Sequence, residues 1–291
     1  MPARRALLAL AVLALAGLAL PPDLLAWTPG THIHLGESVL QQLHRLPPDV
    51  ADLLRAFPLD FLYGSIAPDS SLAKKYAPRG RHSHAWHVGD ELVQQAPSDA
   101  LRAFGMGWLA HLAADTVAHN YYVPRQLLLT TVTPNAGHAY WESRVEAELG
   151  PRVAREAREL LREGHAAADA YMDRLIAPTL FPVRVNRRLF RGMVQVADWA
   201  GWQHGMRLVR ARTRWPLPGW VVERHLDWSL RHVLGALGAA PAAPRALDPA
   251  GAMPLARAKQ LRRRALAAGG DREGRLEAVA AEHFGLPDAA R

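Results

Sequence analysis

The sequence predicts an all-α protein: a multi-helix bundle that carries a metal cluster, followed by a C-terminal helical extension. Three observations lead to this prediction. Apolar residues recur at helical spacing, no run of alternating β-branched residues is present, and chemistry-bearing side chains stand four residues apart in the middle of the chain. The sequence contains neither a glycine-rich phosphate loop nor an internal repeat.

The chain has 291 residues, a formal net charge of +8 and no cysteine. This length allows one large domain, or a domain with an appendage. Because cysteine is absent, disulfides and thiolate zinc sites are excluded, and any metal must be bound by histidine, carboxylate or main-chain groups. Nine of the 14 histidines lie between residues 32 and 138. We therefore expect the chemistry in the first half of the chain, and scaffold or partner surface in the second half.

Residues 1–26 have the pattern of a targeting segment. A basic start precedes an unbroken apolar run over residues 6–20, which is shorter than the ~20 residues of a membrane span. We expect a signal peptide that is cleaved after Ala26, so that the mature chain starts at Trp27 and is secreted or periplasmic. The alternative is an uncleaved N-terminal anchor through residues 6–20.

The first helix of the mature chain is expected to start around His32, after a Pro-Gly turn signal and with Thr31 as its cap. His32 and His34 are two residues apart and point in different directions on a helix, so only one of them can share a metal. If cleavage frees the amino group of Trp27, its nitrogen and its carbonyl oxygen form a chelate one helical turn from His32.

A second helix is expected over residues 47–61, and a loop that holds Asp69 follows it. An aspartate after proline is ordinarily a turn or cap residue, and its functional interpretation is a carboxylate at the mouth of a pocket. The next segment, RGRHSHAWH, indicates either metal binding or an exposed histidine-rich loop. Its three histidines are His82, His84 and His87.

Two segments in the middle of the chain give the clearest metal signal. His111, Asp115 and His119 recur every four residues, which is a helical period. Eight residues of helix rise about 12 Å, so His111 and His119 are too far apart to bind one ion. His138 and Glu142 repeat the i,i+4 spacing on the next expected helix. One such pair is usually solvated or internally hydrogen-bonded, but two pairs with a third histidine in step predict a metal site.

The second half of the chain reads as scaffold. Mixed-sign charges over residues 152–176 indicate a helix with a solvated face, and residues 186–210 and 219–237 read as two more amphipathic helices. A basic helix near the end favours a solvated face over contact with anionic lipid or nucleic acid. The expected segments are a helical domain over 27–237, a Pro/Ala linker over 238–254 and a basic helical tail over 255–291.

Five segments, taken in chain order, resemble the motifs of a known family. They are AWTPGTH, GSIAPD, HSHAW, HLAADTVAHNYYVP and GHAYWE, and the family is the zinc-dependent phospholipases C, which are related in fold to the S1/P1 nucleases. The resemblance covers residues 26–150 and says nothing about residues 151–291. It implies a helical phospholipase C/P1 nuclease-like bundle that binds zinc. Three ions are expected, and two are the minimum.

Carried across residue by residue, the resemblance also implies a set of ligands. Asp69 would lie beside a shared water as general base or orienter. This sequence departs from the family pattern at one point. In well-known secreted members, more residues separate the aspartate of the long helix from its second histidine than separate Asp115 from His119 here. His82 and His87 are rivals for the role of His84, and His34 is a rival for that of His32. The implied ligands are His84, His111 and Asp115 for one zinc; His119, His138 and Glu142 for a second; and Trp27 and His32 for a third, with Asp115 bridging the third to the first.

The implied activity is zinc-dependent hydrolysis of a phosphodiester, of phospholipase C type, with a phospholipid or a membrane surface as partner. The same metals would serve an S1/P1-like single-strand nuclease, for which Tyr121, Tyr122 and Trp141 are candidate stacking platforms. Glu142, in place of an aspartate, resembles the phospholipase branch. A third alternative is a membrane-anchored, non-catalytic zinc-binding protein that keeps its leader.

Overall fold

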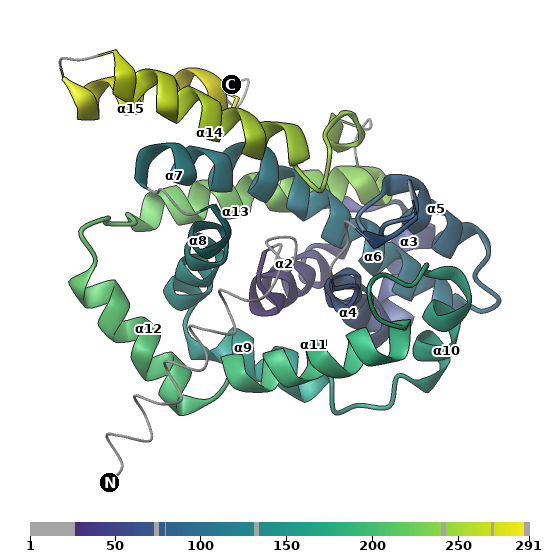
Figure 1. The fold of residues 1–291 in the computed structure, drawn as a ribbon. Helices are drawn as coiled ribbons and strands as arrows, with labels where there is room; N and C mark the ends of the chain where they lie inside the picture. The colour runs from purple at the N-terminus through teal and green to yellow at the C-terminus, as the bar shows by residue number, and fades with distance from the viewer. Residues whose placement is uncertain are drawn as a thin grey trace, which may run out of the picture.

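In the computed structural model, all regular secondary structure of the described residues is helical, so the predicted all-α class is confirmed (Figure 1). The structure describes residues 27–72, 76–78, 80–130, 134–239, 243–268 and 271–287. The predicted signal peptide or anchor over residues 1–26 lies outside these ranges. Of the helices that are described, none combines the length and the apolar character that crossing a membrane requires.

The helices follow one another with short connections. The α-helices are α2 (Pro29–Leu40), α3 (Pro48–Ala56), α4 (Pro58–Ile66), α5 (Trp86–Gln94), α6 (Asp99–Val117), α7 (Val123–Thr130), α8 (Pro134–Leu149), α9 (Pro151–Leu160), α10 (Ala166–Leu175), α11 (Val183–Ala197), α12 (Ala200–Arg212), α13 (Gly219–Leu234), α14 (Ala252–Ala267) and α15 (Arg272–Phe284). Shorter 3-10 or π turns are η2 (Leu43–Arg45), η3 (Ala67–Ser70), η5 (Ala118–Tyr122), η6 (Gly235–Ala239) and η7 (Ala243–Ala246).

The long helix α6 forms the centre of the molecule. The side chain of Ser98 caps its start by accepting a hydrogen bond from the Leu101 main-chain nitrogen at 3.3 Å. A surface helix keeps a polar stripe, but every residue of α6 from Gly107 to Val117 is buried. The polar side chains on this segment therefore have no solvent to face, and they must find partners inside the protein.

Helix α4 crosses α6 at a backbone-to-backbone contact. A Cβ atom added at Gly107 would lie 2.0 Å from the carbonyl oxygen of Phe61, and one added at Gly64 would lie 2.0 Å from the carbonyl oxygen of Phe104. Only glycine fits at both positions, because any side chain would force the two helices apart. This close approach brings the end of α4, and the turn η3 that follows it, against the middle of α6.

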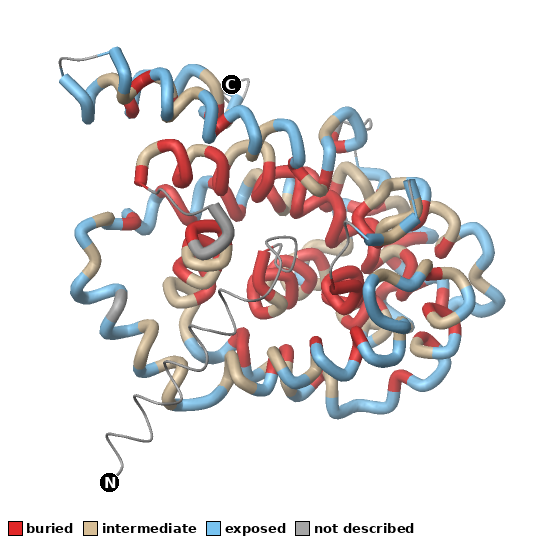
Figure 2. Tube along the Cα trace, in the orientation of Figure 1, coloured by how far each residue is buried: buried red, intermediate tan, exposed pale blue. Residues whose placement is uncertain are grey.

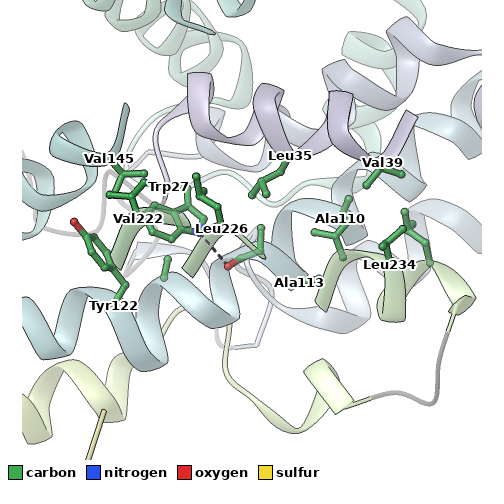
Figure 3. Packing of buried hydrophobic residues seen from close by; sticks show 14 of the residues in the cluster. Trp27, Leu35, Val39, Ala110, Ala113, Tyr122, Val145, Val222, Leu226 and Leu234 are labelled. Carbon is green, nitrogen blue, oxygen red and sulfur yellow. Dashed lines mark hydrogen bonds between the residues drawn. The ribbon is translucent and has the colours of Figure 1, made fainter. Parts of the chain in front are cut away.

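Trp27 anchors the start of the described chain in the core. Its side chain is fully buried, its indole nitrogen donates to the carbonyl oxygen of Ala114 at 3.2 Å, and its ring centroid lies 5.1 Å from that of Tyr122. Figure 3 shows this packing, in which apolar residues of α2, α6, α8 and α13 meet around the tryptophan. The buried residues line the inner faces of the helices, and the exposed ones lie on their outer faces (Figure 2).

Several predicted helix boundaries were wrong. The helix that follows Trp27 starts at Pro29 with Thr28 as its N-cap, three residues earlier than expected. The expected helix over 47–61 is two helices, because Phe57 precedes Pro58 and takes a non-helical conformation (φ −129°, ψ 55°). The expected helices over 152–176 and 186–210 are likewise pairs: α9 with α10, and α11 with α12. The helix expected over 219–237 is α13 with the π turn η6.

Helices α14 and α15 lie across α7 at the C-terminal end of the chain (Figure 1). The contact buries an apolar set of its own, which is separate from the two larger core clusters around α6. Its buried members are Leu128, Ala258, Ala265, Leu276, Ala280 and Phe284. The basic tail expected from the sequence therefore forms two helices, and they keep one face on the bundle.

Candidate metal centre

Five buried side chains converge where α2, η3, α6 and the turn before α5 meet. His32, His111 and Asp115 offer ligand atoms that all lie within 4.8 Å of one another, and Asp69, His84 and His111 do the same. Because the two groups share His111, we treat them as one set and name it the first cluster. Each of its five side chains is at most 1% exposed.

The distances within the first cluster are short. The Nε2 atoms of His84 and His111 lie 3.0 Å apart, and each lies 3.2 Å from Oδ2 of Asp115. The other oxygen of Asp115 lies 3.3 Å from Nε2 of His32. Oδ1 of Asp69 lies 3.4 Å from Nε2 of His84 and 3.7 Å from Nε2 of His111. Asp115 thus presents one carboxylate oxygen to each side, as a bridging carboxylate does.

A second cluster consists of His119, His138 and Glu142, whose ligand atoms also lie within 4.8 Å of one another. His119 stands on the π turn η5, and the other two residues stand one helical turn apart on α8. Nε2 of His138 lies 3.2 Å from Nε2 of His119 and 2.8 Å from Oε1 of Glu142. As the helical rise predicted, His111 and His119 belong to different clusters.

The outer nitrogens of three histidines have partners of their own. Nδ1 of His111 donates to the carbonyl oxygen of Ser65 at 2.9 Å, and Nδ1 of His119 donates to that of Pro249 at 2.5 Å. Nδ1 of His84 lies 3.0 Å from the hydroxyl of Ser83. A carbonyl oxygen can only accept, so His111 and His119 carry their proton on Nδ1. Their Nε2 lone pairs therefore point into the clusters, in the tautomer that a metal ligand needs.

The pKa values of the two carboxylates shift in opposite directions, although burial raises both. Burial raises the pKa of Asp115, but His111 and the neighbouring imidazoles of His32 and His84 outweigh it and hold the pKa well below its ordinary value. Burial raises the pKa of Glu142 to about 8, against the opposing effect of His119. Burial, together with His111, also lowers the pKa of His32, which favours the neutral imidazole that binds metals.

Both clusters fit zinc. Two imidazole nitrogens that bind one tetrahedral zinc at about 2.0–2.1 Å stand about 3.3 Å apart, and the observed separations are 3.0 and 3.2 Å. Within the described residues, buried atoms of the two clusters that make no hydrogen bond include Nε2 of His32, both oxygens of Asp115 and Oε2 of Glu142. Such atoms are costly to bury without a partner, and a divalent cation would satisfy them.

The structure distinguishes between rival histidines that the sequence left open. His32 lies in the first cluster, whereas His34 lines a surface groove beside Glu148 and Glu223. His84 is buried in the first cluster, whereas His87 is exposed. Among the described residues, His82 is in none of the groups that could hold a metal, and it is partly buried.

The structure adds detail on two other candidate residues. Asp69 was expected on an irregular loop beside a water, and it lies on the turn η3 with its carboxylate among the possible ligand atoms. The Trp27 side chain is buried in the core, and its indole reaches the residue before Asp115. This places the start of the described chain beside α6, next to the first cluster.

Sequence reasoning missed the groups that contact the Nδ1 atoms of the histidines. The carbonyl oxygens of Ser65 and Pro249 orient His111 and His119, and a main-chain carbonyl leaves no signature in residue type. The hydroxyl of Ser83 beside His84 had a weak signal, since it lies between two histidines of the HSHAW segment.

Comparisons with known proteins agree with this geometry. A family model described as zinc dependent phospholipase C matches residues 31–181, which is just over half of the chain. An uncharacterized protein of Archaeoglobus fulgidus is 32% identical over 100 residues, which cover 32% of this chain and 26% of that relative. The chain thus spans about a quarter of the relative's length. No solved structure matches. The chain belongs to the zinc-dependent phospholipase C family.

Proposed function

We propose that the protein is a zinc-dependent phosphodiesterase of phospholipase C type, which hydrolyses a phospholipid to diacylglycerol and a phosphorylated alcohol. The observation that carries this proposal is a pair of buried clusters of histidines and carboxylates that share one continuous helical segment, α6 with η5. This segment gives His111 and Asp115 to the first cluster and His119 to the second. The family to which the chain belongs supports the reaction class.

The residues that would hold zinc follow from the clusters. His84, His111 and Asp115, whose ligand atoms lie 3.0 to 3.2 Å from one another, would hold one ion, and His119, His138 and Glu142 a second. Zinc, when bound, supplies positive charge that neutralises phosphate oxygens and makes water more acidic. A third ion would take His32, the free oxygen of Asp115, and the main-chain nitrogen and oxygen of Trp27.

Asp69 is the proposed general base. Its carboxylate lies 3.4 Å from Nε2 of His84, so it is in position to accept the proton of a water held between the first-cluster ligands. The phosphodiester would lie with its oxygens toward the clusters, while the imidazole of His111 keeps its Nε2 lone pair directed inward. Asp69→Asn would then reduce kcat strongly while the protein keeps its zinc, which separates a base from a ligand.

The Trp27 ligand requires a cut before this residue. We propose that the leader is removed during export, which makes the mature protein secreted or periplasmic with Trp27 at its amino terminus. The buried indole supports this, since it holds the residue beside Ala114 and so next to Asp115. Mass spectrometry of the exported protein tests the proposal, and a chain that begins at Met1 would contradict it.

A lipid substrate is supported by exposed apolar residues on a segment that is hydrogen-bonded to Leu72, three residues after Asp69. Thr179 donates from its hydroxyl to the carbonyl oxygen of Leu72, which ties the segment before α11 to the residues that follow η3. Beside this tie, the side chains of Leu180 and Phe181 are 56% and 42% exposed. Apolar side chains that stand in water near a reaction centre suit acyl chains better than a nucleic acid.

The experiment that tests the function compares two substrates. The zinc-loaded protein is incubated with phosphatidylcholine micelles and, separately, with single-stranded DNA. We expect release of the phosphorylated head group from the micelles, and loss of that activity when a chelator removes the zinc. Cleavage of the DNA alone would favour the nuclease, and cleavage of neither substrate by a zinc-saturated protein would favour the non-catalytic alternative.

A further inference from the structure

A short segment far along the chain lies against the second cluster. Residues 244–251 run from η7 to the start of α14, and we name them the strap. The strap lies well beyond residues 31–181, the part of the chain that the family model matches. From its sequence this stretch reads as Pro/Ala linker, with no residue type that suggests chemistry.

One end of the strap is fixed to α5. The guanidinium of Arg245 makes two hydrogen bonds to the carboxylate of Asp90, at 2.7 and 2.8 Å. It also lies over the ring of Trp86, 5.1 Å from the centroid. The indole nitrogen of Trp86 in turn donates to the carbonyl oxygen of Leu247 at 3.0 Å. These contacts set the path of the strap before it reaches the metal centre.

The other end of the strap contacts a candidate zinc ligand directly. The carbonyl oxygen of Pro249 accepts from Nδ1 of His119, and the opposite nitrogen of that ring lies 3.2 Å from His138 and 3.5 Å from Glu142. Both Pro249 and His119 are buried. This one bond therefore fixes two properties of the imidazole: which nitrogen carries the proton, and where the other one points.

Further hydrogen bonds fix the position of the strap against η5. Asn120 donates from its amide nitrogen to the carbonyl oxygens of Asp248 and Thr116, at 2.9 and 2.8 Å. The carboxylate of Asp248 accepts from the main-chain nitrogens of Ala250 and Ala252, at 2.9 and 3.2 Å, so the turn is closed on itself. Asn120 thus joins the strap to the π turn beside the bond that His119 makes to Pro249.

Gly251 allows the closest approach between the strap and η5. Its φ angle is +59°, in the left-handed region, and a Cβ atom at this position would lie 2.3 Å from Cβ of His119 and 2.6 Å from its carbonyl oxygen. No side chain fits there unless the strap or the π turn moves. Since the Pro249 carbonyl lies two residues away, such a movement would lengthen or break its bond to His119.

We propose that the strap is a positioning element for zinc: through the Pro249 carbonyl it holds His119 in the tautomer and direction that complete the second cluster. This inference rests on the zinc ligands proposed above, but not on the substrate. A part of the chain outside the matched family region thereby belongs to the metal centre. A strap that only stabilised the fold would leave the histidine tautomer and the affinity for one particular ion unchanged.

The test compares two glycine variants of the full chain. Gly251→Ala introduces a clash with His119. Gly150→Ala is the matched control, because Gly150 also has a positive φ (+89°) and an added Cβ would meet nothing within 4 Å. Both substitutions strain the backbone, so both lower the melting temperature. Only Gly251→Ala should change the second cluster.

Two readouts follow that do not need the reaction. In the zinc-free protein, long-range ¹H–¹⁵N spectra of the histidines should show His119 protonated at Nδ1 in the wild type and in Gly150→Ala, and a mixture of tautomers in Gly251→Ala. In a titration of zinc against a competing chelator, one ion should bind 10–100-fold more weakly to Gly251→Ala, the usual effect of losing an outer partner of a ligand. The other ion or ions should keep their affinity.

The possible outcomes distinguish the positioning role from a purely structural role of the strap. Unchanged tautomer and unchanged zinc affinity in a folded Gly251→Ala would overturn the proposal, as would an equal loss of zinc in Gly150→Ala. If Gly251→Ala does not fold, Asn120→Ala removes the amide hydrogen bond that joins η5 to the Asp248 carbonyl oxygen of the strap, and a smaller weakening of the same single ion is expected. If the ion weakens as predicted and no phosphatidylcholine is hydrolysed by the wild type, the positioning role stands and the proposed function fails.

Discussion

The two clusters are built on one helical segment but are supported from different parts of the chain. The first cluster takes its outer support from Ser65, at the end of α4, where glycines let α4 touch α6. The second takes its support from Pro249, which lies outside the region matched to the family. In both, a glycine permits the approach and a carbonyl oxygen orients an imidazole. The comparison shows two ways to bring a main-chain carbonyl oxygen to a buried imidazole. In the first cluster the packing of two helices does so, and in the second a strap that is distant in the sequence does so.

The clusters also differ in charge. In the first, three imidazoles surround Asp115 and hold its pKa well below the ordinary value despite burial. In the second, burial raises the pKa of Glu142 to about 8, and the charges of Asp115 and Asp69 add to the effect. The first carboxylate is thus ready to bind a cation, whereas the second gains its compensating charge only when the cation arrives.

The largest expected effect comes from Asp115, whose two oxygens face different imidazoles. Asp115→Asn removes the negative charge between His32, His84 and His111, so we expect hydrolysis to fall by roughly a thousandfold or more. Metal analysis should show loss of zinc from the first cluster, while the second keeps its ion. Zinc content equal to that of the wild type would contradict the assignment of Asp115 as a ligand.

The next effect tests the packing that supports the first cluster. Gly107→Ala places a methyl group against the Phe61 carbonyl, and we expect a loss of about 1–3 kcal/mol or more in the free energy of unfolding. Chemical denaturation measures it. Gly192→Ala is the control, since this glycine lies within α11 with open space around it, and alanine there should stabilise by about 0.5–1 kcal/mol. Equal effects of the two changes would mean that α4 and α6 do not touch.

Glu142→Gln tests the difference in carboxylate charge between the two clusters. It should raise the melting temperature of the zinc-free protein and reduce the stability that zinc adds. A carboxyl whose pKa is higher in the folded chain than in the unfolded chain destabilises the fold once the pH exceeds the unfolded value of 4.5. At pH 7 without zinc, the variant should therefore melt about 2–4 °C higher than the wild type, and the difference should shrink near pH 4. With zinc, the variant should gain less stability than the wild type does. Calorimetry under the three conditions measures this reversal, and a lower melting temperature in the zinc-free state would refute it.

The smallest effect is expected at His34. This side chain lines the groove beside Glu148, away from both clusters, so His34→Ala should change stability by no more than about 0.5 kcal/mol and leave zinc binding intact. His32→Ala, two residues away, should remove one ligand of the first cluster. Zinc titration of the pair measures the contrast, and a loss of zinc in His34→Ala would reverse the choice between the two histidines.

Helical spacing was enough to predict which side chains stand together on one helix. His111 with Asp115, and His138 with Glu142, are one turn apart, and the structure brings each pair together. The meeting of His32 and His84 with them came only from the family resemblance, because distances between separate helices depend on packing. Their roles as zinc ligands remain predictions that the experiments above address.

Other features had no usable signal in the sequence. The break at Phe57 was hidden because an apolar residue before proline fits a continuous helix as well as a boundary. The strap was read as linker, since its contribution is a main-chain oxygen and a glycine, and neither residue type indicates a metal site. Tertiary contacts of this kind depend on where the backbone passes, and residue type records that only weakly.

The contact between His119 and Pro249 joins residues that are 130 positions apart. At 5–20 residues per second, a ribosome needs roughly 6–26 s to travel from one to the other. Once Glu142 has been added, the growing chain contains every side chain of both clusters, but it still lacks the carbonyl oxygen that orients His119. The second cluster therefore lacks this outer support until the ribosome has passed residue 249, and a chain that terminates before Pro249 never acquires the oxygen.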